Sequence, residues 1–209
     1  MPNTLPAERK RYAFPLWMRE FLIVALRQTD GQAEFSASFL TAAKKQGKST
    51  ALAALLRAAL ELPICVNPLL LVAAPSIVKG ALAEFVIDGM MRWPGSVAGG
   101  GLTHAHVPFK VNRQTNSILR NPDFFGPGET GALYNMSEGT AQQTQSAPRG
   151  LIVMDELGRQ SSLELFRQLE ASRRSFLQTS LISVSILGDE TSPHVQILEA
   201  VTRAKRKDV

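Results

Sequence analysis

The amino-acid sequence predicts an α/β fold with a mostly parallel central sheet flanked by helices. Strand-like segments alternate with segments in which apolar residues recur at helical spacing. The run 69–74 is apolar throughout, as expected of a strand buried on both faces of a parallel sheet. Two strand-like segments end in groups suited to phosphate and metal, Gly47-Lys48-Ser49 and Asp155-Glu156. Ligands of open α/β sheets bind at the carboxyl ends of the strands, so these groups indicate a site there.

The length and composition predict one main domain in a reducing compartment. The chain has 209 residues, of which 44% are hydrophobic and 20% charged, enough for one well-buried core. Its one cysteine, Cys65, excludes an internal disulfide and lies in an apolar segment, which favours a buried thiol over a reactive one. The pair His104 and His106 has no cysteine or carboxylate cluster nearby, so zinc is not expected. There is no apolar run of about 18 residues and no signal-peptide core, so we expect a cytoplasmic protein without membrane contact.

The positive charge lies at the two ends of the chain. The net charge is +5, from 23 basic and 18 acidic residues. Seven of the basic residues lie in 9–11 and 203–207, and the rest of the chain has 16 basic and 18 acidic residues. The two basic ends are consistent with solvated tails and equally with contact to nucleic acid.

The expected elements form one domain over residues 16–200, between a basic arm (1–15) and a basic tail or linker (201–209). Strands are expected at 35–43, 69–74, 107–111, 117–119, 132–136, 151–154 and 180–187. Helices are expected at 16–28, 51–62, 77–93 and 162–176, and loops at 121–131 and 137–149.

The segment from Thr41 to Thr50 has the features of a phosphate-binding loop. It joins a strand to an Ala- and Leu-rich helix, where backbone N–H groups and the helix dipole favour an anion. The generic motif asks for glycine at the position of Ala42, so an alternative is that Gly47 only caps a turn before a solvated helix start. In the phosphate-loop interpretation, Lys48 reaches the β- and γ-phosphates of ATP and Ser49 holds Mg²⁺. The predicted nucleotide-binding residues are Lys44, Lys45, Gln46, Gly47, Lys48, Ser49 and Thr50, with Lys44 or Lys45 on the γ-phosphate.

Asp155 and Glu156 are the predicted acids of the same site. They follow four apolar residues, a pattern typical of a buried strand that ends at the ligand-binding edge. Asp155 is expected to hold Mg²⁺ and Glu156 to polarise the attacking water. The alternative is a strand that ends in two solvated acids. Ser183 and Ser185, on the later strand, could sense the γ-phosphate or be satisfied by the backbone.

Taken together, these segments resemble the ATPase domain of the large terminase subunit, the DNA-packaging motor of tailed bacteriophages. The resemblance rests on 43–49 as a glycine-poor phosphate loop, 71–76 as the second strand, 152–157 as the acidic strand and 182–189 as the coupling motif. It implies a three-layer P-loop NTPase fold of the ASCE type, Mg²⁺-dependent ATP hydrolysis, and coupling through Ser183, Ser185 and Gly188. It also implies double-stranded DNA, a portal protein and a small terminase subunit as partners, and a homo-oligomeric, pentameric ring.

The resemblance further suggests that catalysis is completed in trans by Arg149. This residue closes the polar loop before the acidic strand. The alternatives are an ordinary loop residue at this position, or Arg113, Arg120 or Arg173 as the donor. Large terminases also carry a nuclease domain with a cluster of metal-binding aspartates. Residues 189–209 do not contain such a cluster, so we expect the chain to be either a piece of a longer protein or a motor portion without a nuclease domain. Two other functions stay open, a helicase-like translocase and a non-catalytic nucleotide-binding scaffold.

Overall fold

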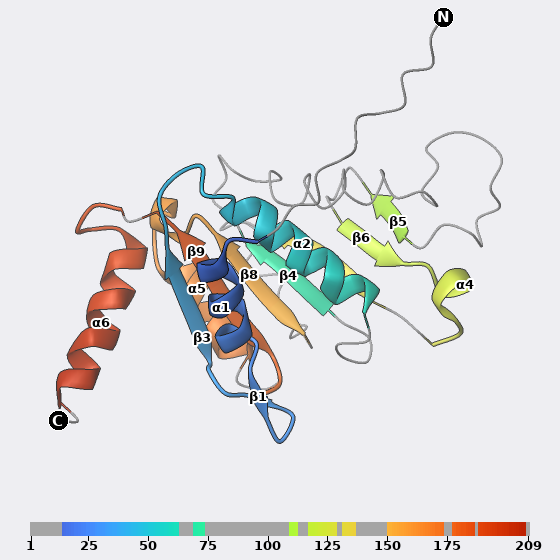
Figure 1. Cartoon of the computed structure of the whole chain (residues 1–209), viewed down its shortest axis with the longest axis horizontal. Coiled ribbons are helices and arrows are strands. Elements are labelled where there is room, and N and C mark those ends of the chain that lie inside the picture. Colours follow the sequence, from blue (N-terminus) through green and yellow to red (C-terminus); the bar gives the residue numbers. More distant parts are fainter. Residues whose placement is uncertain are drawn as a thin grey trace, which may run out of the picture.

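A computed structural model gives the fold of the chain. It describes residues 14–62, 69–73, 109–112, 117–128, 131–136, 150–173, 177–186 and 188–207. These residues form a central sheet with helices α1 (Leu16–Ala25) and α2 (Lys48–Glu61) on one face. Helix α5 (Glu164–Arg173) lies behind the sheet in the same view (Figure 1). This is the arrangement that the sequence predicted, a mostly parallel central sheet flanked by helices.

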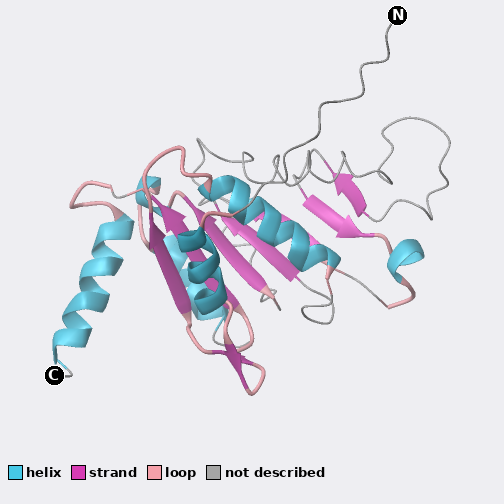
Figure 2. Cartoon of the chain, viewed as in Figure 1, coloured by secondary structure: helices cyan, strands magenta, loops and turns pink. Residues whose placement is uncertain are grey.

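The sheet has seven strands, most of them parallel (Figure 2). In spatial order they are β3 (Ala37–Thr41), β9 (Ser180–Ser185), β8 (Leu151–Asp155), β4 (Leu69–Ala73), β7 (Ala132–Met136), β6 (Ser117–Arg120) and β5 (Phe109–Asn112). The strands from β3 to β7 pair in parallel, whereas β6 and β5 are antiparallel to their neighbours. Strand β9 therefore lies between the phosphate-loop strand β3 and the acidic strand β8, and all three end at the same edge of the sheet.

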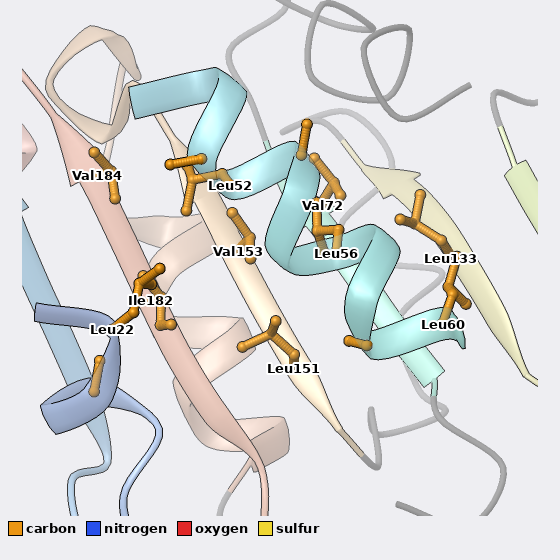
Figure 3. Close-up of a cluster of buried hydrophobic side chains, with 14 of the residues drawn as sticks. Leu22, Leu52, Leu56, Leu60, Val72, Leu133, Leu151, Val153, Ile182 and Val184 are labelled. Atoms are coloured by element: carbon orange, nitrogen blue, oxygen red, sulfur yellow. The ribbon is translucent and has the colours of Figure 1, made fainter. Parts of the chain in front are cut away.

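Strand β8 shows why its sequence is apolar throughout. Successive side chains of a strand point to opposite faces. Leu151 and Val153 face α2 in one buried cluster (Figure 3), whereas Ile152 and Met154 pack with α5 in another. On the α2 face the cluster includes Leu52, Leu56 and Leu60 of α2, together with Val72 of β4, Leu133 of β7, and Ile182 and Val184 of β9. Both faces of β8 are thus buried, and its last residue, Asp155, comes out on the α2 face.

The first predicted helix is shorter than expected. We expected it to continue to residue 28, but α1 ends at Ala25, because β1 (Gln28–Thr29) and β2 (Gln32–Ala33) form an antiparallel hairpin. Its turn is Asp30-Gly31, with φ values of 52° and 74°. An Asp-Gly pair is favoured in tight hairpin turns because both positions require positive φ.

The predicted loop 121–131 contains a short helix, α4 (Pro122–Phe125). Asn121 caps it by accepting a hydrogen bond from the backbone N–H of Asp123, and proline is favoured at the first helical position.

Helix α6 (Pro193–Lys207) was not predicted. It begins after Ser192, whose backbone carbonyl and hydroxyl accept bonds from Gln196 and Val195, and Ser-Pro is a typical helix start. The expected boundary at residue 200 falls inside this helix, so residues 201–207 continue α6. Helix α6 packs on the short 3-10 helix η4 (Leu157–Arg159), and its far half extends beyond the sheet (Figure 1).

Several predictions lie outside the described residues: the arm 1–13, Cys65, the helix 77–93, His104, His106 and the loop 137–149. Within the described part of the chain, no helix has the length and apolar character needed to cross a membrane.

Candidate nucleotide-binding site

The loop 42–47 joins the end of β3 to the start of α2. Gly47 is the N-cap residue of α2 and has the left-handed φ of 76°, which glycine adopts without the steric penalty of a Cβ. Lys45 is also left-handed, with φ of 63°. Lys44, Lys45, Gln46 and Thr50 are exposed, and Gly47 and Ser49 are partly buried. The loop therefore presents exposed lysines around the N-terminus of a fourteen-residue helix, where the helix dipole favours an anion.

Lys48 is buried beneath this loop, so it is not part of a solvated helix start. Its side chain is 5% exposed. Its Nζ donates to the carbonyl oxygen of Ala42 at 3.1 Å and to that of Ala43 at 2.7 Å. A lysine ammonium carries three donors and strongly prefers paired surroundings when buried. Lys48 thus holds a positive charge under the loop, bonded to groups that a phosphate oxygen could replace.

Ser49 and Asp155 meet although they are 106 residues apart in sequence. The Ser49 hydroxyl donates to Oδ2 of Asp155 at 3.2 Å. Asp155 is 1% exposed, and its Oδ1 has no hydrogen-bond partner among the described residues. Burial, and secondly the neighbouring Glu156, raise the pKa of Asp155 from 3.8 to about 6, while Ser49 and Lys48 oppose that rise. The solvated-acid alternative is therefore wrong for Asp155.

The Ser49–Asp155 pair has the chemistry of a Mg²⁺ site. Mg²⁺ is a hard cation that takes oxygen ligands, typically one or two from the protein with the rest from phosphates and water. An orphaned carboxylate oxygen beside a hydroxyl fits that requirement. Within the described ranges no cluster of three or more His, Cys, Asp or Glu could hold a metal by itself. These residues therefore fit a magnesium ion that arrives with a nucleotide.

Glu156 leaves β8 in a strained conformation. Its backbone is left-handed, with φ of 56° and ψ of 42°, although it has a Cβ. Its N–H donates to the carbonyl of Val184 at 2.9 Å, which ties this turn to β9. The carboxylate is 16% exposed and lies 3.6 Å from Nε of Arg159, an ion pair too solvated on the arginine side to contribute much. Non-glycine residues in this region cluster at functional sites, where the surrounding structure maintains the strain.

Ser185 connects the loop to the turn that holds Glu156. Its carbonyl accepts from Ala42 N–H at 3.1 Å, and its hydroxyl accepts from Gly158 N–H at 2.9 Å. Ser183 lies on the same face of β9, is fully buried, and its hydroxyl has no partner in the described structure. Gly188 is required by close packing, because a Cβ there would come 2.4 Å from Oγ of Ser192. The Ser185 hydroxyl is thus satisfied by the backbone, which was one of the two alternatives for this strand.

A cleft opens at the start of the loop. Its volume is about 410 Å³, and Thr41, Ala42, Ala43, Lys44 and Ile186 line it. It lies beside the carbonyls that Lys48 bonds, rather than over the Ser49–Asp155 pair, and it gives solvent and ligand access to the loop.

The predicted trans-acting arginines have different outcomes. Arg149 and Arg113 lie outside the described residues, so their role stays a prediction. Arg120 is buried, donates to the carbonyls of Leu60 and Leu62, and covers the Phe125 ring at 5.0 Å. It therefore caps the C-terminal end of α2, opposite the phosphate loop. Arg173 is also only 7% exposed. Both side chains are buried within the chain and so are not exposed where a neighbouring subunit could meet them, and the identity of the trans-acting arginine stays a prediction.

Sequence reasoning missed one contact of this site. Nε2 of His194, at the start of α6, lies 2.7 Å from Oγ1 of Thr41, the last residue of β3. No sequence pattern indicates this contact, because its two partners are 153 residues apart.

The geometry first defines the fold class, that of P-loop NTPases of the ASCE type, with the loop, the buried lysine and the acidic strand at one edge of the sheet. Comparison with solved structures then identifies the fold more narrowly as that of phage large terminases. The HK97 bacteriophage large terminase aligns with a TM-score of 0.70 and 15% identity, over 94% of this chain and 38% of that protein. The large terminase of a thermophilic bacteriophage aligns with a TM-score of 0.63 and 16% identity, over 92% and 44%.

A further structure of the thermophilic phage terminase, in complex with ADP, aligns with a TM-score of 0.54 and 17% identity, over 83% of this chain and 39% of that one. No family model matches the sequence, and no curated protein matches it. The chain thus spans less than half the length of the HK97 terminase and of the thermophilic phage terminase. The predicted resemblance to large terminases is confirmed for the fold.

Proposed function

We propose that this chain is the ATP-hydrolysing motor domain of a viral DNA-packaging terminase. In this role it couples ATP hydrolysis to translocation of double-stranded DNA into a procapsid. The observation that carries the proposal is the contact of Ser49 with Asp155 at 3.2 Å, beside the buried Lys48. It supports one nucleotide site built from a phosphate loop and an acidic strand.

The loop and Lys48 bind the triphosphate. Lys48 exchanges the carbonyls of Ala42 and Ala43 for β- and γ-phosphate oxygens, while the N–H groups of Gln46, Gly47 and Lys48 bond other phosphate oxygens. Ser49 and Asp155 hold Mg²⁺, which neutralises charge on the phosphates. Lys44 or Lys45, both of which are exposed, contacts the γ-phosphate. The ADP complex of the thermophilic phage terminase supports nucleotide as the ligand.

Glu156 orients and deprotonates the attacking water. Its backbone is fixed by the bond to Val184, and its carboxylate is largely buried. A carboxylate held at the edge of the phosphate site can accept the proton as the water attacks, a contribution of roughly 10²- to 10⁴-fold in rate. Arg149 of a neighbouring subunit in a ring stabilises the developing γ-phosphate charge, a contribution of roughly 10³- to 10⁵-fold.

The experiment compares nucleotide binding and turnover in the wild-type chain, Glu156→Gln and Lys48→Ala, with and without double-stranded DNA. Glu156→Gln should bind ATP as the wild type does but lose turnover, since only the proton acceptor is removed. Lys48→Ala should lose binding as well. Wild-type-like hydrolysis by Glu156→Gln would refute the assignment of the base. DNA-stimulated turnover supports a motor, whereas absence of hydrolysis in the assembled wild type would leave only a nucleotide-binding scaffold.

The arginine is tested by mixing subunits under conditions that assemble the ring. Arg149→Ala and Glu156→Gln subunits should each be inactive alone. A mixed ring should regain activity, because an intact Arg149 can then face an intact Glu156 site. Full activity of Arg149→Ala by itself, or no recovery on mixing, would refute a trans-acting role for Arg149.

A further inference from the structure

The contact between Thr41 and His194 joins the phosphate loop to α6. His194 is 0% exposed, and its ring also packs edge-on against Phe39 of β3, with centroids 6.3 Å apart. Its Nε2 lies 2.7 Å from the Thr41 hydroxyl, and its Nδ1 has no partner among the described residues. The Thr41 bond is thus the polar contact that fixes the imidazole ring, in a place where an unpaired polar group costs free energy.

Four residues around this contact form what we name the α6 junction: Thr41, Gly158, Ser185 and His194. A Cβ on Gly158 would lie 2.9 Å from the Ser185 hydroxyl and 3.7 Å from Cβ of His194, so these backbones approach closely. Ser185 is paired in register with Thr41 and bonds Gly158, two residues after Glu156. The start of α6 is therefore packed against both the phosphate-loop strand and the turn that carries the predicted base.

Nucleotide binding, in the mode proposed above, changes the hydrogen bonds of the chain next to Thr41. Lys48 exchanges the carbonyls of Ala42 and Ala43 for phosphate oxygens. These are the two residues that follow Thr41, which is the last residue of β3. A change in their peptide orientation is carried through Thr41 to His194, because the Thr41 hydroxyl is hydrogen-bonded to the buried imidazole ring.

Helix α6 can transmit a change at its buried first turn to its exposed C-terminal half. Its first residues, Pro193 and His194, are buried, whereas Glu199 to Arg203 are exposed. A small rotation at the buried end is a larger displacement at the exposed end, since a helix moves as a rigid element.

We propose that His194 is a positioning residue that transmits the state of the phosphate loop to α6 through its hydrogen bond with Thr41. This inference rests on the proposed nucleotide site. It adds a route for coupling that uses neither the Ser183 hydroxyl nor Gly188.

The test measures hydrogen–deuterium exchange of α6 amides with and without saturating Mg-ADP. Calorimetry establishes that nucleotide is bound. In the wild type, Mg-ADP should change exchange in the first turns of α6 by roughly 2- to 12-fold, the range expected for making or losing one hydrogen bond. In Thr41→Val, which keeps the shape of the side chain but lacks the hydroxyl, this response should be lost at saturating nucleotide.

Two conservative variants separate this role from a purely structural one. Thr41→Ser keeps the hydroxyl, and His194→Gln keeps an amide group near the position of Nε2, so both should retain the response. A response that persists in Thr41→Val, or that is absent in the wild type although Mg-ADP binds, would overturn the proposal. If the wild type binds no Mg-ADP, the proposed nucleotide site itself fails, and the inference fails with it.

Discussion

Removing the negative charge of Asp155 should stabilise the protein in the absence of nucleotide. The carboxylate is buried, its Oδ1 is unpaired, and its pKa is raised from 3.8 to about 6 by burial first and by Glu156 second. One pKa unit corresponds to about 1.4 kcal/mol, so the charged form destabilises the folded state by about 3 kcal/mol at neutral pH. Asp155→Asn keeps the shape and a hydrogen-bonding oxygen for Ser49 while removing that charge.

The stability difference between Asp155→Asn and the wild type should depend on pH. Between pH 3.8 and about 6 the folded chain binds more protons at Asp155 than the unfolded chain, so this residue lowers stability as pH rises through that window. The advantage of Asp155→Asn should therefore be fully present at pH 7 and vanish near pH 4. For a chain of this length, 3 kcal/mol corresponds to roughly 6–12 °C in melting temperature.

The assay is urea unfolding with EDTA present, at pH 4 and pH 7, with Asp30→Asn as the control. Asp30 is an exposed turn residue in the left-handed region, which asparagine also tolerates. Asp30→Asn should change the free energy of unfolding little at either pH. Equal stability of Asp155→Asn and wild type at pH 7, or a gain that persists unchanged at pH 4, would refute the reasoning.

Three further predictions concern packing and protonation. Leu56 is fully buried between α2 and the sheet, so Leu56→Ala should lower the free energy of unfolding by about 2–5 kcal/mol. The control is Leu16→Ala, at a position that is 67% exposed, which should lower it by less than about 0.5 kcal/mol. Equal losses in the two variants would contradict the core described above. Gly188→Ala should destabilise by about 1–3 kcal/mol in urea titration, because its Cβ meets Ser192; a neutral effect would show that this approach relaxes freely. Burial lowers the pKa of His194 below 6.5, so below about pH 6.5 the histidine takes up a proton more readily in the unfolded chain than in the folded one. The wild type should therefore lose stability relative to His194→Gln as the pH falls through this range. Parallel pH profiles of the free energy of unfolding would argue against a buried neutral imidazole.

Local chemistry explains which parts of the fold the sequence could predict. The Ala-rich helix after Gly47 and the apolar strand before Asp155 are set by short patterns, and both were found within a few residues. The Asp30-Gly31 pair is an equally local signal, but it was interpreted as the end of a helix and not as a hairpin turn, and the Ser192-Pro193 helix start was overlooked. The contact of Thr41 with His194 is different in kind, because it depends on where α6 docks, and docking is decided by tertiary packing.

The predicted site residues share a physical property that sequence patterns do not reveal. Asp155 has an orphaned oxygen, Glu156 holds a strained backbone, and the ammonium of Lys48 bonds its own loop. The orphaned oxygen of Asp155 and the strained backbone of Glu156 lower the stability of the folded chain without ligand. A nucleotide with Mg²⁺ supplies a cation for Asp155 and an anion for Lys48. A ligand that binds only the folded state stabilises it, by about 2.7 kcal/mol at a concentration of 100 Kd. The resistance of this chain to unfolding should therefore depend on Mg-nucleotide more strongly in the wild type than in Asp155→Asn, because that variant has already lost the charge that the cation neutralises.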